Sequence, residues 1–201
     1  MNDKTKITDA TYGNDLSGLK LDKNKTYNAS EVYFYEAQNI LKASIDYLST
    51  IPNKKSAPFD YDFFLKLHKE MFGDVWDWAG KMRIVELNFG VKAYLVNAEV
   101  KKLADDLHFW KSNKSFDTIE IAARLHHRAV AIHPFLNGNG RWSRMLANIY
   151  LKQNGLEPTK WNENLLAKKN IHRGDYIQAL KQADNGNYKP LIKMQGNMIN
   201  K

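Results

Sequence analysis

The sequence predicts an all-α protein that carries one small β-hairpin and folds as a single domain. Three observations predict this class. Apolar residues recur at helical spacing through most of the chain. One pair of short β-prone runs, separated by turn residues, interrupts that pattern. No internal repeat or linker is found, and 201 residues suit one well-buried domain better than two.

The chain divides into a polar arm and one domain. Residues 1–27 are rich in Lys, Asp, Asn, Thr and Gly, and we expect a flexible arm. Residues 28–201 form the expected domain. Its first helix begins at Ala29 and ends at Pro52. The apolar residues at helical spacing along it are Phe34, Leu41, Ile45 and Leu48.

A second helix is expected over Tyr61–Phe72. The hairpin is expected over residues 83–96. Its β-prone runs are Arg83–Leu87 and Lys92–Val96, and Asn88–Gly90 supplies the turn. Helical spacing then resumes at Val100, Leu103, Leu107 and Trp110.

The next helix has clear end signals. It begins at Asp117, with Glu120 three residues later as in a capping box. It must end near Ile132, because Pro134 keeps His133 out of the helical region. A further helix follows the glycines of residues 138–140, and the remainder from residue 161 is expected to be helical with a break at residues 184–186.

Composition limits the function classes. The net charge of +8 favours an anionic partner, but the lysines are dispersed without a basic tract, which disfavours nucleic acid. The absence of cysteine excludes disulfides, thiolate metal sites and cysteine nucleophiles. No apolar run is long enough for a membrane span or a secretory signal, so a cytoplasmic protein is expected.

The segment from His133 to Arg144, HPFLNGNGRWSR, carries the chemistry. Gly138 and Gly140 allow the backbone to approach a ligand closely, and the N–H groups at the start of the following helix form an anion site. Arg141 and Arg144 are three residues apart, so they share one helix face and suit a polyphosphate.

His133 lies at the edge of this segment and can accept a proton near neutral pH. Each feature also has an ordinary reading: a structural histidine, solvated arginines, or a Gly-Asn-Gly turn. Their joint occurrence in this order favours a site. The spacing is not that of a P-loop.

Residues 133–144 resemble the Fic motif, HPFx(D/E)GNGRxxR. Residues 83–96 resemble the Fic flap, a hairpin that aligns a target segment by strand addition. The resemblance extends over about residues 30–195 and is strongest to the subgroup called mobile mystery protein B. The C-terminal residues that carry it are Arg173, Tyr176, Ala179, Leu180, Ala183, Gly186, Pro190 and Leu191.

The resemblance implies a nucleotidyl transferase that moves AMP from ATP, with Mg²⁺ or Mn²⁺, to a Ser, Thr or Tyr hydroxyl of a target protein. His133 would be the general base, and Phe135 would anchor the loop. The implied phosphate-binding residues are Gly138, Asn139, Gly140, Arg141 and Arg144. The implied target-docking residues of the flap are Gly90, Val91, Ala93 and Tyr94.

Asn137 departs from the family pattern, which has an acidic metal ligand at this position. A neutral amide oxygen binds a hard cation less strongly than a carboxylate. Three outcomes stay open: slower AMP transfer, transfer of a different group, or a catalytically weak nucleotide-binding module that acts through a partner chain.

Glu36 is the second departure. Many Fic proteins carry an inhibitory helix, (S/T)xxxE(G/N), whose glutamate pairs with the second arginine of the motif. Here Glu36 is present, but Val32 and Ala37 replace the hydroxyl and the small residue. The hypothesis is that Glu36 pairs with Arg144 and restrains the enzyme. The alternatives are an ordinary helix residue and inhibition by a separate antitoxin-like chain.

Two further histidines, His126 and His127, are adjacent on a helix and point in different directions, so no histidine-bound metal is expected. We expect one of them to be buried and hydrogen-bonded. Tyr176 is expected in the core, with the border of an adenine pocket as the alternative.

Overall fold

The computed structural model describes residues 16–22, 24–162, 166 and 171–197. Its helices are α1 (Ala29–Leu48), α2 (Tyr61–Phe72), η1 (Ala93–Leu95), α3 (Val96–Ser112), α4 (Thr118–Ile132), α5 (Asn139–Gln153), α7 (Ile171–Asp184) and α8 (Lys189–Asn197). Within these ranges the only pairing of extended backbone is one isolated bridge, between Leu19 and Trp76. The all-α class is therefore confirmed.

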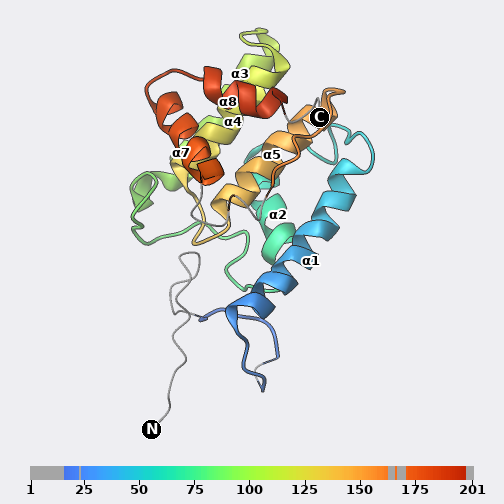
Figure 1. Cartoon of the computed structure of the whole chain (residues 1–201), viewed down its shortest axis with the longest axis vertical. Helices are drawn as coiled ribbons and strands as arrows, with labels where there is room; N and C mark the ends of the chain where they lie inside the picture. Colours follow the sequence, from blue (N-terminus) through green and yellow to red (C-terminus); the bar gives the residue numbers. More distant parts are fainter. Residues whose placement is uncertain (1–15, 23, 163–165, 167–170, 198–201) are drawn as a thin grey trace.

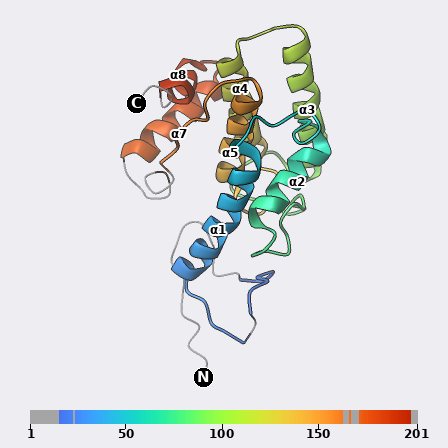
Figure 2. The same cartoon turned by 90° about the vertical axis from the view of Figure 1, so that its right-hand side faces the viewer.

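Helix α5 forms the centre of the molecule, and α4 packs along it more extensively than any other helix (Figure 1). Eleven of the fifteen residues of α5 are buried, so this helix is enclosed on nearly every side. Helices α1 and α2 cover one flank of α5, whereas α7 and α8 lie beyond α4 on the other (Figure 2). The loop that joins α4 to α5 is thereby held between the two most buried helices.

The predicted ends of α4 are confirmed. The Asp117 carboxylate accepts a hydrogen bond from the Glu120 N–H at 2.7 Å, which caps the helix. At the other end the helix stops at Ile132, and His133 takes a left-handed conformation with φ 53°. This geometry turns the chain directly from α4 into the loop before α5.

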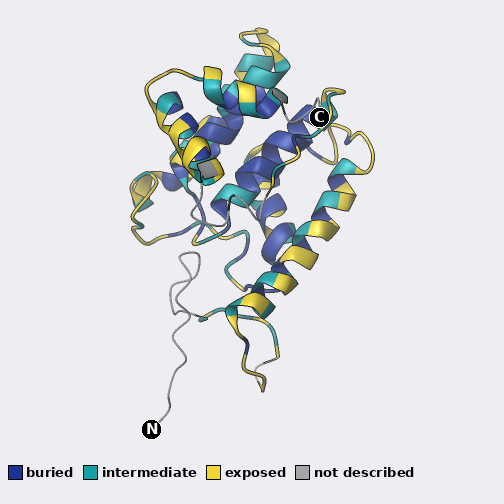
Figure 3. Cartoon of the chain, viewed as in Figure 1, coloured by how far each residue is buried: buried dark blue, intermediate teal, exposed yellow. Residues whose placement is uncertain are grey.

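Helix α1 buries a different face from the one its apolar spacing suggests. Phe34, Leu41 and Ile45 are more than half exposed, and the outer side of α1 is largely yellow in Figure 3. The buried side carries Glu36 and Asn39 instead. Asn39 is buried at little cost, because its side-chain amide donates to the Glu70 carbonyl and accepts the Asp74 N–H.

The predicted hairpin over residues 83–96 is wrong as a secondary structure. Residues 83–92 form a loop without strands, Ala93–Leu95 is a 3-10 turn, and Val96 already begins α3. The reason lies in the hydrogen bonds. The Arg83 N–H donates to the Pro134 carbonyl at 2.9 Å, and the Val91 N–H donates to the Ile132 carbonyl at 3.3 Å. The backbone N–H groups of both arms therefore bond to the α4–α5 turn rather than to the backbone of the other arm.

Of the predicted arm, residues 1–15 and residue 23 lie outside the described residues. Described residues of the arm contact the domain: the Lys20 N–H donates to the Val75 carbonyl, and the Asp77 N–H donates to the Gly18 carbonyl, both at 2.8 Å. No helix in the described part of the chain is long and apolar enough to cross a membrane.

Candidate active site

The α4–α5 loop turns at two left-handed residues, His133 and Gly138. Gly138 has φ 77° and precedes the first residue of α5. A Cβ atom at Gly138 would lie 2.6 Å from the ring of Phe72, so only glycine fits both the dihedral angle and the space. The backbone angle and the close contact with Phe72 of α2 therefore explain why position 138 is glycine.

Asn139 holds the loop closed through its side chain. Its Oδ1 accepts the Phe135 N–H at 2.9 Å, and its Nδ2 donates to the Phe135 carbonyl at 2.8 Å. Phe135 itself is buried, with its ring 5.0 Å from that of Trp142. The Asn139 side-chain amide thus pairs with both the N–H and the carbonyl of Phe135, which closes the loop directly ahead of α5.

His68 supports the loop from α2, and the sequence patterns gave it no role. Its ring stacks on that of Phe135 at 3.6 Å. Its Nδ1 accepts the Gly80 N–H at 3.0 Å, so the proton lies on Nε2, which donates to the Asn137 carbonyl at 3.0 Å. Burial lowers the pKa of His68 to about 3, which keeps the ring neutral.

Asn137 presents only a neutral oxygen. Its Oδ1 accepts the N–H of Gly138 at 2.6 Å. No group of three or more His, Cys, Asp or Glu side chains suited to a metal ion occurs among the residues that the structure describes. The protein's own ligands at this position are therefore too few to hold a divalent cation, and other ligands would be needed.

Arg141 is paired with Glu36 across α1 and α5. The Arg141 Nη1 lies 2.6 Å from Glu36 Oε2, and the Trp76 Nε1–H donates to Glu36 Oε1 at 2.5 Å. Glu36 is completely buried. The hypothesis that Glu36 pairs with Arg144 is wrong about the partner, because its ion pair is with the first arginine of the segment.

Arg144 lies on the opposite flank. It is buried, and its guanidinium carbon is 6.0 Å from the Trp161 ring centroid and 5.7 Å from that of Tyr176. Arg141, by contrast, lies 4.8 Å from the Phe72 ring. The two arginines thus frame the first turn of α5 from two sides. Tyr176 is buried as expected for the core, and its hydroxyl lies 2.9 Å from His126 Nε2.

His133 is half-buried at the edge of the site. Burial lowers the pKa of its ring, and the nearby positive charge of Arg83 lowers it further, against the hydrogen bond to the Val130 backbone. At neutral pH the ring is therefore mainly in the neutral form that accepts a proton. Phe89 packs with its ring 6.4 Å from that of His133. A Cβ atom at Gly90 would lie 2.6 Å from the His133 Cβ.

His126 and His127 are both buried within the helical core. His127 Nε2 lies 2.8 Å from an Asp184 carboxylate oxygen, and its Nδ1 lies 3.2 Å from the Tyr188 hydroxyl. The prediction was that one of the two histidines is buried and hydrogen-bonded, and both of them are. His127 is thus directed to Asp184 and Tyr188, whereas His126 bonds to Tyr176, whose ring lies beside Arg144.

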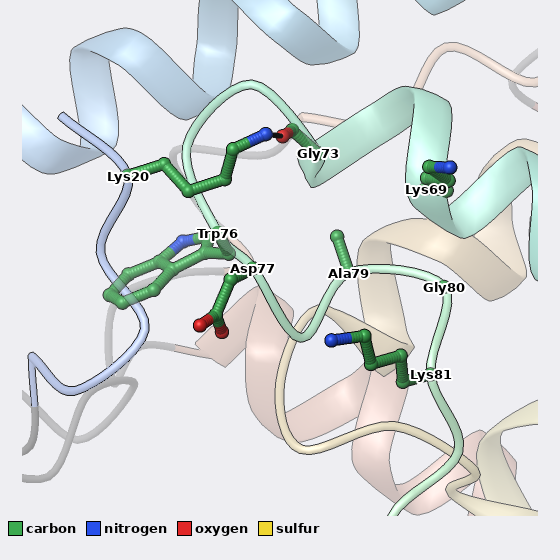
Figure 4. Close-up of a pocket in the computed structure, with 8 residues that line it drawn as sticks. All are labelled: Lys20, Lys69, Gly73, Trp76, Asp77, Ala79, Gly80 and Lys81. Atoms are coloured by element: carbon green, nitrogen blue, oxygen red, sulfur yellow. Dashed lines mark hydrogen bonds between the residues drawn. The ribbon is translucent and has the colours of Figure 1, made fainter.

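A separate pocket of about 430 Å³ lies between the N-terminal segment and the loop after α2 (Figure 4). Its walls include Trp76 and Gly80, which also bond to Glu36 and His68 respectively. Lys20, which lines it, donates to the Gly73 carbonyl. The residues that line this pocket include none of the 133–144 segment.

Fold and site together define a helical protein of the Fic type. One loop between two buried helices presents a neutral histidine beside a helix N-terminus and two arginines. The Fic/DOC family model matches residues 58–151.

Relatives with curated names agree with this class. Protein adenylyltransferase Fic of Nematostella vectensis is 27% identical over 157 residues, which cover 76% of this chain and 35% of that protein. Protein adenylyltransferase VbhT of Bartonella schoenbuchensis is 33% identical over 96 residues, which cover 44% of this chain and 20% of that protein. The chain spans about a third or less of the length of these relatives.

Solved structures share the fold. Fic-1 from C. elegans superposes with a TM-score of 0.67 at 23% identity, covering 89% of this chain and 52% of that one. BepC from Bartonella tribocorum, solved with bound AMPPNP, gives a TM-score of 0.63 at 18% identity, covering 88% and 90%. Residues 58–151 of the chain belong to the Fic/DOC family. The subgroup stays a prediction.

Proposed function

We propose that this chain transfers AMP from ATP to the hydroxyl group of a Ser, Thr or Tyr side chain in a target protein. The observation that carries the proposal is the α4–α5 loop, with a half-buried neutral His133 at one end and the N-terminus of α5 at the other. The relatives above are named protein adenylyltransferases, and one structural neighbour holds AMPPNP, which supports the same chemistry.

The reaction follows from this arrangement. The imidazole of His133 accepts the proton of the target hydroxyl. The hydroxyl oxygen then forms a bond to the α-phosphorus of ATP. The bond from that phosphorus to the oxygen bridging to the β-phosphate breaks, and pyrophosphate leaves. The protein contributes mainly by positioning the reactants and by stabilising negative charge.

The nucleotide phosphates are assigned to the N-terminus of α5. The backbone N–H groups of Asn139 and Gly140 would bind the α- and β-phosphates, because they lie at the positive end of the helix dipole. Gly138 would join them once its N–H leaves Asn137 Oδ1. Arg141 and Arg144 would neutralise the β- and γ-phosphates. The side chain of Asn139 acts indirectly, through its two bonds to Phe135.

Target docking is assigned to the loop that replaces the predicted hairpin, at Gly90, Val91, Ala93 and Tyr94. Tyr94 is 80% exposed and Phe89 is 75% exposed. Because residues 84–89 have no strand partner of their own, their backbone can pair with an extended target segment. Large exposed side chains beside His133 would then hold the target hydroxyl near the base.

A divalent cation, Mg²⁺ or Mn²⁺, would enter with the triphosphate as part of the substrate. The neutral Oδ1 of Asn137 adds one weak ligand, and phosphate oxygens and water supply the others. Asn137 also motivates the second candidate function: a catalytically weak nucleotide-binding module controlled by an antitoxin-like partner chain.

Glu36 is proposed to restrain the enzyme by holding Arg141. While this ion pair is intact, Arg141 is directed to α1 and away from a polyphosphate. An antitoxin-like regulator is the alternative source of such control.

Label transfer tests the proposal. The protein is incubated with Mg²⁺ or Mn²⁺ and with ATP labelled at the α- or the γ-phosphate, together with a cell lysate as a source of targets. Label from the α position that disappears in His133→Ala is the expected result. Label from the γ position alone would contradict AMP transfer and indicate phosphoryl transfer.

Asn137→Asp separates the two candidate functions. If the wild type transfers no label and Asn137→Asp does, the active site is of the Fic type and its activity is limited by the weak metal ligand Asn137. If both are silent while calorimetry shows ATP binding, the nucleotide-binding module is the better description. Absence of ATP binding in both would exclude either function.

A further inference from the structure

Arg83 is a buried cation that is bonded only to backbone carbonyls. It is 2% exposed. Its Nε donates to the His133 carbonyl at 2.6 Å, and its Nη1 donates to the Val85 carbonyl at 3.0 Å. Its Nη2 donates to the carbonyls of Val91 at 2.5 Å and Ile132 at 3.4 Å. The guanidinium thus uses four hydrogen bonds of the five that it can donate.

These carbonyls belong to three different pieces of chain. Val85 lies at the beginning of the exposed loop, Val91 lies at its end, and residues 132 and 133 end α4. A planar guanidinium joins them at one point, a geometry that the single ammonium of lysine cannot copy. The backbone bonds from Arg83 to Pro134 and from Val91 to Ile132 tie the same pieces together.

The position of His133 depends on this junction. His133 is held at φ 53°, a left-handed conformation that is uncommon for a residue other than glycine. Its carbonyl is fixed by Arg83. At Gly90 a Cβ atom would lie 2.7 Å from Arg83 Nη2 and 2.8 Å from the Ile132 carbonyl. The loop therefore packs tightly against the Arg83 guanidinium and the end of α4.

We propose that Arg83 is a positioning residue that fixes the backbone of His133 and anchors the target-docking loop to it, so that the base and the docking segment keep one relative geometry. The proposal deepens the proposed AMP transfer and rests on it for its consequence in rate. A second support is electrostatic: the charge of Arg83 helps to lower the pKa of His133. The other groups facing the ring, Phe89, Gly90 and the Val130 backbone, are uncharged.

Two substitutions separate geometry from charge. Arg83→Lys keeps the cation and removes the planar fork, whereas Arg83→Met keeps an apolar stem and removes the cation. Arg128→Met is the matched control, because Arg128 is a partly exposed arginine on α4 that pairs with Asp106 and Glu99. Transfer is expected to fall about 100-fold in both Arg83 variants, as for a small misplacement of reacting groups. Arg128→Met should stay near wild type.

The distinguishing readouts do not need activity. NMR titration of His133, assigned by its absence in His133→Ala, should give a higher pKa in Arg83→Met and an unchanged pKa in Arg83→Lys. Hydrogen exchange at the Val91 amide should quicken about ten-fold or more in both variants. If Arg83→Met does not fold, Arg83→Lys still tests the clamp through Val91 exchange and transfer rate.

The outcomes separate this inference from the proposed function. Val91 exchange as in wild type in either Arg83 variant would overturn the clamp. If wild type transfers no label and both physical readouts change as expected, the clamp stands and the proposed transfer fails. If wild type transfers label and the Arg83 variants match its rate, the clamp fails and the transfer stands.

Discussion

Glu36 has both carboxylate oxygens engaged, one by Arg141 and one by the indole of Trp76. A buried carboxylate without partners would be costly, so this geometry holds Arg141 firmly. Competition between Glu36 and a polyphosphate for the same guanidinium is the consequence that matters for function.

Glu36→Gln is expected to increase ATP affinity and transfer by weakening that competition. The amide can still accept the Trp76 N–H, so folding should be retained with a stability loss of about 1–3 kcal/mol. Calorimetric titration with ATP and the label-transfer rate measure the effect. Asp46→Asn, an exposed change on the same helix, is the control. Equal ATP affinity in Glu36→Gln and wild type would remove the proposed restraint.

Sequence reasoning located the reactive segment at residue scale, because His133, the glycines and the two arginines are contiguous. It missed Arg83 and His68, and it assigned the wrong partner to Glu36. These three depend on contacts between distant segments: Glu36 and Arg141 are 105 residues apart, and His68 and Asn137 are 69 apart. The one available signal for Arg83 was its place at the beginning of a β-prone run, which does not indicate a side chain bonded to four carbonyls.

At the scale of elements, the entry into α5 depends on Gly138. Gly138→Ala should cost stability twice: about 1–2 kcal/mol for a left-handed alanine, and about 1–3 kcal/mol for overpacking against Phe72. Gly155→Ala is a matched control, because Gly155 has φ 79° and a Cβ atom there meets nothing within 4 Å. Urea unfolding of both variants measures the difference. Equal losses would show that Phe72 does not restrict this turn.

Helix α1 gives the second prediction at this scale. Leu41→Gln and Ile45→Gln remove side chains that are 59% and 56% exposed, so each should change stability by less than about 0.5 kcal/mol. Val32→Ala, on the buried face, should cost about 2 kcal/mol. Thermal or urea unfolding compares them. A large loss from Leu41→Gln would mean that the apolar face is covered in solution.

The same helix shows where periodicity stops being informative. Spacing identified a helix correctly but could not tell which face is buried, because Glu36 and Asn39 become compatible with burial only through partners on α2, α5 and the loop after α2. The failed hairpin has a related cause. Neither β-prone run forms a strand: Ala93–Leu95 of the second run is a 3-10 turn and Val96 begins α3. The backbone N–H groups of Arg83 and Val91 donate to the α4–α5 turn, which no local pattern reveals.

At the scale of the whole molecule, buried neutral histidines make stability depend on pH. Burial lowers the pKa of His68 and that of His126 to about 3 each, from an ordinary 6.5. Above pH 6.5 both folded and unfolded states are neutral at these sites, and pH has no effect through them. Below pH 6.5 the unfolded state binds protons that the folded state does not, so stability falls as pH falls until about pH 3.

The free energy of unfolding is expected to fall by about 1.4 kcal/mol per pH unit for each histidine. For the pair this amounts to about 4 kcal/mol between pH 6.5 and pH 5. Urea midpoints at pH 7.5, 6.5, 5.5 and 5.0 measure it. His68→Gln and His126→Gln should each remove about half of the slope, whatever they cost at pH 7.5. A midpoint independent of pH over this range would show that the two rings gain protons without unfolding. His68 bonds to the Asn137 carbonyl of the α4–α5 loop, and His126 lies near Arg144 of α5, so protonation of these rings loosens contacts of the candidate site. Activity should therefore decline in step with stability.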